Sequence, residues 1–195
     1  NLNLQAELRR RKTEYGDLRL NFDPDDFSSG DRTNVDQDTV RLGAHFSLSP
    51  QSDLYVSFIH SNREENKIIF SNALSNVLPD IFPDLFSGPK VNTDVNDLGY
   101  QAEAQYLIRS SHYSVIAGIG SYDIETEQHI ISSISNQIES KFESNFKRER
   151  DNAYIYANIN YPSNLIWTLG LSYDAFHEGN YYSDNLNPKL GLLWN

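Results

Sequence analysis

Cysteine and methionine are both absent from this chain of 195 residues. Without cysteine, neither a disulfide framework nor a thiolate metal site can form. The sequence has no apolar run close to the roughly 18 residues that a membrane-spanning helix needs, which excludes a helical membrane protein. Basic residues are scarce, with 16 Lys and Arg against 27 Asp and Glu and a formal net charge of -11. This acidity argues against a nucleic-acid partner, because phosphate backbones are bound by clustered Lys and Arg.

Aromatic residues, by contrast, are plentiful, although only 38% of the chain is hydrophobic. They make up 12% of the sequence and include twelve Tyr. Low hydropathy with many aromatics is typical of an outer-membrane β-barrel, in which only alternate residues face lipid and the rims collect Tyr and Trp. The chain begins with the strand-like segment Asn1–Leu4 and shows neither Met nor a signal peptide, which predicts a processed form or a fragment.

Apolar and polar residues alternate over residues 165–175. Leu165, Trp167, Leu169 and Leu171 occupy every second position, and mostly small or polar residues fill the gaps. That period of two predicts a strand with one apolar and one polar face. Similar patterns predict seven more strands, over about residues 2–12, 40–48, 54–63, 98–108, 113–120, 153–161 and 190–194.

Tight turns and long polar loops alternate between the predicted strands. Turn-forming residues predict three tight turns, at 49–53, 110–112 and 162–164. Long loops are predicted over about residues 16–38, 66–97, 125–151 and 177–187.

We therefore predict an all-β fold, an antiparallel transmembrane up-and-down β-barrel with eight visible strands and long extracellular loops. Residues 1–195 would form a single outer-membrane barrel segment, with the turns and both chain ends on the periplasmic side. An interfacial girdle is predicted near the turns, made of Tyr106, Tyr113, Tyr161, Trp167 and Trp194.

The last third of the chain carries three motifs that invite comparison: DNAYIYANIN at 151–160, WTLGLSYD at 167–174 and LNPKLGLLW at 186–194. With the earlier stretches 22–25 and 99–107, they resemble the barrel region of porin-like proteobacterial outer-membrane proteins that carry tetratricopeptide repeats ahead of the barrel. More distantly, the chain resembles TonB-dependent receptors and exopolysaccharide-export barrels. In the repeat-carrying family further hairpins follow the last motif, so the resemblance implies that this is an interior portion of a larger barrel.

The polar faces of the predicted strands collect charged and amide side chains, which inside a barrel need water or mutual pairing. In a barrel of eight strands they would form a static salt-bridge network, whereas in a larger barrel they would line a hydrated pore and tune its permeation. The predicted lumen-lining residues are Glu7, Arg9, Arg11, Arg41, His45, Gln101, Glu103 and Gln105.

Histidine and serine residues raise the alternative of a barrel hydrolase. His45 and Ser47 share a predicted inner face but lie near the turns, whereas His60, Asp174 and His177 lie nearer the outer end. No spacing brings a nucleophile, a base and an orienting group together. We therefore expect no enzymatic activity, no catalytic residues and no cofactor.

The first long loop is strongly acidic. Asp23, Asp25 and Asp26 form a weak candidate for Ca²⁺, because grouped carboxylates supply hard oxygen ligands. Their spacing does not match the calcium-loop pattern. A solvated acidic loop, bridged to lipopolysaccharide phosphates by divalent ions, is therefore favoured over a dedicated metal site.

The second and third long loops are unexpectedly apolar. In the third loop, large apolar residues recur every fourth position between Ile130 and Phe146, which predicts a short amphipathic helix. The loops could pack on each other as a cap, plug the lumen or dock a partner. In the second loop, a roughly helical period broken by proline predicts a constriction or partner patch made of Leu78, Ile81, Phe82, Leu85 and Phe86.

These patterns predict a porin-like channel, or an export or uptake conduit with a loop-restricted lumen, in the outer membrane of a Gram-negative bacterium. The alternatives are a non-conducting surface-binding or complex-building barrel, such as an adhesin or scaffold, and a soluble all-β binding domain. Predicted partners are outer-membrane lipid and lipopolysaccharide. A protein bound at the extracellular loops and a homo-oligomer are further alternatives.

Overall fold

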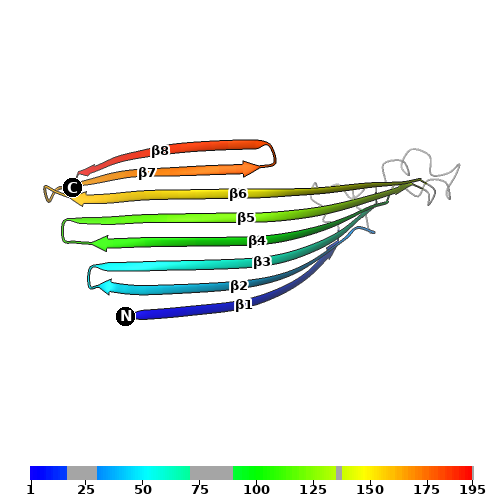
Figure 1. The fold of residues 1–195 in the computed structure, drawn as a ribbon, viewed down its shortest axis with the longest axis horizontal. Coiled ribbons are helices and arrows are strands. Elements are labelled where there is room, and N and C mark those ends of the chain that lie inside the picture. Colours follow the sequence, from blue (N-terminus) through cyan, green and yellow to red (C-terminus); the bar gives the residue numbers. More distant parts are fainter. Residues whose placement is uncertain (17–29, 71–89, 135–137, 195) are drawn as a thin grey trace.

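The computed structural model describes residues 1–16, 30–70, 90–134 and 138–194 of the chain. These residues form one sheet of eight strands, and each strand pairs antiparallel with its neighbour in sequence (Figure 1). The strands are β1 (Leu2–Gly16), β2 (Arg32–Ser49), β3 (Ser52–Phe70), β4 (Lys90–Arg109), β5 (Tyr113–Ile134), β6 (Ile138–Asn160), β7 (Leu165–Glu178) and β8 (Tyr181–Trp194). The predicted all-β, up-and-down order is confirmed. The described residues contain no helix of the length and apolarity that crossing a membrane requires.

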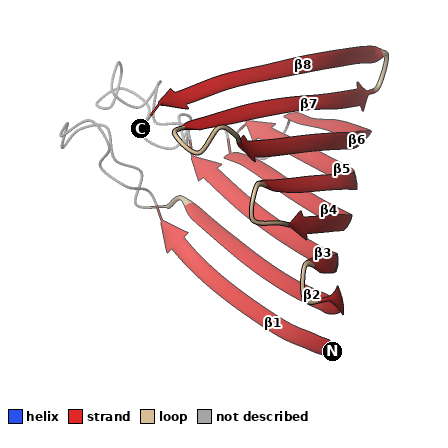
Figure 2. Cartoon of the chain, turned by 90° about the vertical axis from the view of Figure 1, so that its left-hand side faces the viewer, coloured by secondary structure: helices blue, strands red, loops and turns tan. Residues whose placement is uncertain are grey.

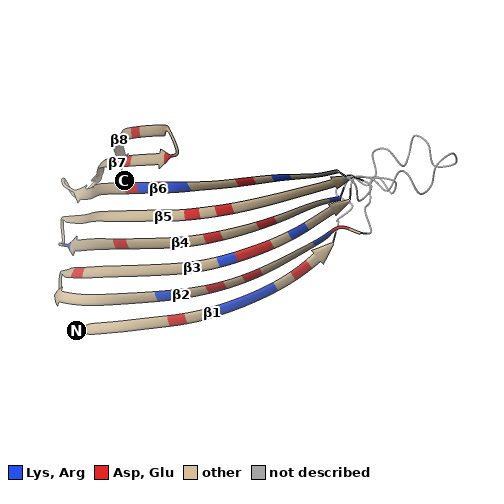
Figure 3. Ribbon diagram, turned by 45° about the vertical axis from the view of Figure 1, so that its right-hand side comes forward, with Lys and Arg blue, Asp and Glu red and all other residues tan. Residues whose placement is uncertain are grey.

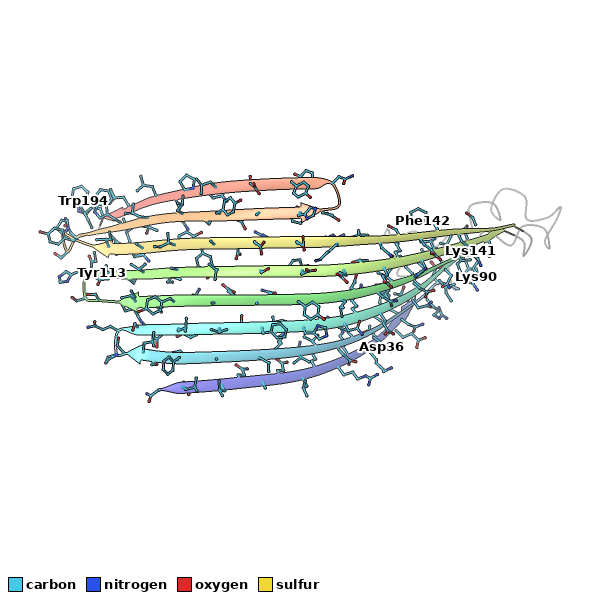
Figure 4. The ribbon with its side chains drawn as sticks, in the orientation of Figure 1. Asp36, Lys90, Tyr113, Lys141, Phe142 and Trp194 are labelled. Carbon is cyan, nitrogen blue, oxygen red and sulfur yellow. The ribbon has the colours of Figure 1, made fainter. Side chains whose placement is uncertain are left out.

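The three tight turns lie where the sequence predicted them. They join β2 to β3, β4 to β5 and β6 to β7 at one end of the sheet, and both termini lie at that same end (Figure 1). Figure 4 shows Tyr113 and Trp194, two residues of the predicted girdle, at this turn end.

The sheet is curved and its two edges are open (Figure 2). Among the residues that the structure describes, β1 pairs only with β2 and β8 only with β7. The described sheet is therefore not closed into a barrel. An unpaired strand edge is not tolerated in hydrocarbon, because its N–H and C=O groups find no water there.

The strand register sorts the side chains onto two chemically distinct faces, because directly opposite residues of an antiparallel ladder point the same way. One row across the sheet is apolar throughout: Leu4, Ala44, Val56, Ala104, Ile119, Ala153, Tyr173 and Leu186. The adjacent row, on the opposite face, is polar or glycine throughout: Gln5, Gly43, Ser57, Glu103, Gly120, Asn152, Asp174 and Asn185. We call these faces the outer face and the inner face, respectively.

The described residues contain no buried hydrophobic core. The buried residues among them are all polar, and large apolar side chains of the outer face are exposed, with Leu8 82% and Leu190 75% exposed. A water-soluble chain of this size would bury such side chains, because exposing them to water is unfavourable. The outer face must therefore be covered by lipid, which excludes the soluble all-β domain.

The apolar part of the outer face forms a belt at the turn end of the sheet. Aromatic residues bracket it on both sides, with Trp167 and Tyr173 on β7 and Tyr106 and Tyr100 on β4. At about 3.3 Å per residue, each pair is separated by about 20 Å along its strand. This height approaches the apolar band of about 25 Å that surrounds outer-membrane barrels.

Beyond the belt, the sheet continues away from the turns. β4, β5 and β6 have 20, 22 and 23 residues, whereas a strand needs only about 9–11 to cross a bilayer. Charged residues concentrate in this distal part, while the turn end of the sheet is largely free of them (Figure 3). The sheet therefore projects from the membrane on the side opposite the turns.

The strands run further than the sequence pattern predicted, so the first two long loops are shorter than predicted. The predicted loop 16–38 includes the start of β2 at Arg32. The predicted loop 66–97 includes the end of β3 at Phe70 and the start of β4 at Lys90. In the projecting part both faces meet water, so the apolar–polar alternation that marks a membrane strand is lost there.

The other two predicted loops are wrong for the same reason. Within the predicted loop 125–151, only residues 135–137 separate β5 from β6. Within the predicted loop 177–187, only the turn residues Gly179 and Asn180 separate β7 from β8. Gly179 in this turn has a φ of 58°, a left-handed conformation that glycine adopts without steric cost.

The amphipathic helix predicted between Ile130 and Phe146 is also wrong, because these residues belong to β5 and β6. A spacing of four keeps residues on one face of a helix, but it also keeps them on one face of a strand. Ile130 lies directly opposite Phe142 in the ladder, and Phe146 lies opposite Thr126. Pairing between the two strands therefore uses the same apolar pattern.

Candidate functional site

The inner face contains all eight residues predicted to line a lumen. Glu7 lies opposite Arg41, and Arg9 and Arg11 follow on the same face of β1. Gln101 lies in the same row as Glu7 and Arg41. The other three lie in rows nearer the turns: His45, Glu103 and Gln105. The alternation in the sequence placed these residues on one face correctly, and their role is taken up below.

Tyr154 connects two of these residues across an intervening strand. Its hydroxyl donates to Glu103 Oε1 at 2.8 Å and accepts from Gln105 Nε2 at 2.9 Å. Tyr154 is on β6 and the other two are on β4, so the ring must lie flat over β5. Gly118 of β5 makes this possible, because an added Cβ would lie 2.4 Å from Tyr154 Cζ.

A second tyrosine lies flat in the opposite direction. Tyr156 covers Gly170 of β7, where an added Cβ would meet the ring at 2.3 Å. Lys189 of β8 holds its ammonium group 5.8 Å from the centre of the same ring, within the range of a cation–π contact. The two tyrosines therefore tie β4 to β8 along the inner face through glycines that leave room for their rings.

Nearer the projecting end, arginine–carboxylate pairs cross the strands of the inner face. Arg63 of β3 binds Asp97 of β4 at 2.9 Å, and Thr126 of β5 donates to the same carboxylate at 2.7 Å. Arg148 of β6 binds Glu178 of β7 at 2.8 Å. These ion pairs join neighbouring strands on the inner face, and each guanidinium is paired with a carboxylate.

A hollow of about 680 Å³ opens beside these pairs on the inner face. Glu103 and Asn152 line its side nearer the turns, and Arg150 and Asp174 also line it. Arg150 binds Asp174 at 2.6 Å, so charges of both signs line the hollow. A wall of this kind offers hydrogen bonds to a polar solute without a uniform field of either sign.

At the turn end, Asp53 gathers three donors. His45 Nε2 lies 2.8 Å from Asp53 Oδ1, Ser47 donates to the same oxygen at 3.0 Å, and Arg109 pairs with the other oxygen. In a hydrolase the histidine would accept the serine proton while the carboxylate held its other nitrogen. Here both His45 and Ser47 are directed at one carboxylate oxygen, so the cluster fixes the rim of the sheet instead.

On the outer face beyond the belt, charged groups link β6 to β7. Lys147 Nζ lies 2.6 Å from Glu149 Oε1, and Glu149 Oε2 lies 3.0 Å from His177 Nδ1. His177 Nε2 also faces the carbonyl oxygen of Gly179 at 2.8 Å. Bonds from Lys147 and then His177 lower the pKa of Glu149, and the bond to Glu149 is the main cause of a raised pKa of His177.

Because folding raises the pKa of His177, the protonated ring stabilises the fold below its ordinary pKa of about 6.5, and this contribution is lost as pH rises through the higher folded value. An NMR titration of the full-length protein should therefore place the pKa of His177 above 6.5, and Glu149→Gln should lower it. Glu143→Gln on the same strand, which removes the partner of His129, should leave it unchanged. A His177 pKa insensitive to Glu149→Gln would contradict the assigned contact.

The sequence revealed the face of the connecting residues but not their partners. Tyr154 and Tyr156 fall on the polar side of a clear alternation, yet nothing in the sequence indicates that they cross to β4 and β8. Asp53 and Arg109 lie in or next to turns, so neither was a predicted site residue. A strand register was the missing information, since it decides which residues are neighbours.

Several predicted site residues lie outside the described residues. They are the weak Ca²⁺ candidates Asp23, Asp25 and Asp26, and the constriction residues Leu78, Ile81, Phe82, Leu85 and Phe86. Within the described ranges, no group of three or more His, Asp or Glu residues is arranged to hold a metal ion.

Neither a family model nor a curated protein matches the sequence, but the fold matches solved structures of transporters. The match to the unliganded ferric citrate transporter FecA covers 100% of this chain and 31% of the FecA chain, with a TM-score of 0.70 and 14% identity. The copper transporter OprC matches 98% of this chain and 31% of its own, with a TM-score of 0.59 and 11% identity. The outer membrane transporter YddB from Escherichia coli matches 99% of this chain and 27% of its own, with a TM-score of 0.52 and 9% identity.

This chain therefore spans about a third or less of the length of these structures. At such low identity the likeness shows the fold alone. Together with the lipid-facing belt and the missing core, it defines the chain as a segment of an outer-membrane β-barrel, the kind of barrel that Gram-negative bacteria place in their outer membrane. The neighbours named are described as transporters.

Proposed function

We propose that this chain forms part of the wall of an outer-membrane transport barrel whose solute passes along the inner face. The observation that carries the proposal is the pair of adjacent rows, one apolar across all eight strands and one polar across all eight. The open edges support a barrel of more than eight strands, in which the inner polar groups need not fill the interior.

The finer features of the proposal come from the sequence. They are a porin-like or gated conduit, restriction of the lumen by the loops, and kinship with the barrels that follow tetratricopeptide repeats. Outer-membrane lipid and lipopolysaccharide are the proposed partners of the belt and of its upper rim. Two of the named neighbours, FecA and OprC, are transporters of ferric citrate and of copper, which supports small-solute transport as a class without identifying a cargo for this chain.

Single-cysteine labelling tests the conduit, because this chain has no cysteine of its own. In the full-length protein, with any cysteine elsewhere replaced, Ser57→Cys and Ser172→Cys would sit on the inner face and Leu171→Cys on the outer belt. We expect a charged, water-soluble thiol reagent to label the two inner positions and to reduce the current through a planar bilayer. Leu171→Cys should react only with a lipid-soluble reagent.

A non-conducting scaffold is the second candidate, and the projecting part of β4, β5 and β6 favours it by presenting a broad surface outside the membrane. That candidate predicts no current from the full-length protein and no current change on labelling Ser57→Cys. Current that falls on labelling would exclude it. A silent barrel with unreactive inner cysteines would overturn the conduit.

A further inference from the structure

The inner face of β1 and β2 carries three arginines and one carboxylate, that of Glu7, which contacts two of the three. Arg9 binds Glu7 Oε1 at 2.9 Å, and Arg41 lies 3.6 Å from Glu7 Oε2. Arg11 follows Arg9 on the same face, about 7 Å further along the strand. Its Nε donates to the hydroxyl of Thr13 at 3.1 Å, and no carboxylate contacts it among the described residues.

The residues opposite Arg9 and Arg11 are neutral, whereas Arg41 lies opposite Glu7. Arg9 faces Thr39 and Arg11 faces Gln37 in the ladder. Both partners are occupied with the next strand, since Gln37 donates to Ser61 at 3.1 Å and Thr39 lies 3.4 Å from the same hydroxyl. The residues of β2 opposite Arg9 and Arg11 are therefore polar and uncharged, and they do not offset the positive charge of these two arginines.

The outer face of the same strand provides a contrast. Its basic residues alternate with those of the inner face, but each has a carboxylate of its own on β2. Arg10 lies 3.7 Å from Asp38, and Lys12 lies 2.8 Å from Asp36. The run of basic residues visible on β1 in Figure 3 is thus balanced on the outer face and unbalanced on the inner face.

The unbalanced guanidinium groups are accessible and chemically suited to an anion. The side chains of Arg9 and Arg41 are 59% and 46% exposed. A guanidinium presents donors in a planar fork that matches the two oxygens of a carboxylate or phosphate. Two arginines separated along a strand and a third on the neighbouring strand could hold a ligand that carries more than one anionic group.

We propose that Arg9, Arg11 and Arg41 form a binding site for polyanionic solutes bearing phosphate or carboxylate groups, with Glu7 as a competing internal anion. The proposal rests on the proposed function in one respect: the inner face must be reached by solute. The chain as a whole is acidic, but this part of the inner face carries a local excess of positive charge.

The test uses the full-length protein in detergent micelles free of lipopolysaccharide, titrated calorimetrically with inorganic pyrophosphate at low salt. The triple variant Arg9→Gln, Arg11→Gln and Arg41→Gln should bind about tenfold more weakly or worse, the loss expected when charge-assisted hydrogen bonds are removed. Glu7→Gln should bind more tightly than the parent, because it frees two guanidinium groups. These opposite effects separate a binding site from general damage to the fold.

The matched control is the outer-face double variant Arg10→Gln and Lys12→Gln, which should bind pyrophosphate like the parent. Weaker binding by this control would assign the anion to the outer face and overturn the proposal. A parent that does not bind, or a triple variant that binds equally well, would also overturn it. Pyrophosphate binding at the arginines without any bilayer current would refute the conduit while leaving the site in place.

Discussion

Leu171→Arg is expected to lower the free energy of unfolding of the full-length protein in lipid vesicles by about 2–4 kcal/mol. Leu171 belongs to the outer face near the middle of the belt, and its ladder partners are Ile155 and Pro188. An arginine there would carry its charge into hydrocarbon, where neither water nor a carboxylate of the described sheet is at hand. Urea unfolding of the vesicle-inserted protein provides the measurement.

Ser172→Arg is the matched control, because the next residue of the strand has the same depth but faces inward. Its ladder partners are Tyr154 and Asn187, so the new charge would meet polar groups and solvent. We expect a much smaller loss than for Leu171→Arg. Equal losses at the two positions would show that the two faces do not differ in environment, and the assignment of the belt would fail.

Gly118→Val should destabilise the protein by about 1–3 kcal/mol, the usual cost of forcing extra atoms into occupied space. The new side chain would collide with the ring of Tyr154, which lies 2.4 Å from the position of the added Cβ. Displacing the ring would also break its hydrogen bonds to Glu103 and Gln105. Denaturant titration of the full-length protein measures the loss.

A double-mutant cycle with Tyr154→Ala identifies the cause. If the collision is responsible, Gly118→Val should cost far less in the Tyr154→Ala background, because coupling between touching residues reaches several tenths to about 3 kcal/mol. Gly43→Val is the control on the same face, since its added Cβ would find only Gln5 Cβ at an ordinary 3.8 Å. Valine suits a strand, so this control should be neutral or slightly stabilising.

The sequence predicted the architecture because the membrane imposes a strict alternation wherever the strands cross it. In the segment 165–175 each outward residue must suit lipid, so the period of two is unmistakable. The same logic failed past the belt, where Ser183 and Asp184 both tolerate water and the strand looked like a loop. The physical constraint that makes alternation readable is absent outside the bilayer.

The candidate site was only half accessible to sequence reasoning. Alternation alone placed Arg9 and Arg11 on the inner face and Arg10 on the outer face. What it could not reveal was that Asp38 neutralises Arg10 while neutral residues face the other two. That difference depends on the register between β1 and β2, which is set by pairing along their whole length.

The strictly sequential order of the strands also has an evolutionary consequence. No strand of the described sheet is inserted between two others that are distant in the chain, so each hairpin touches only the hairpins next to it. A duplicated or deleted hairpin would change the circumference while leaving every other strand pair as it was. Descent with changing barrel size is therefore mechanically simple for such a chain, and proteins of different strand number can retain the same local architecture.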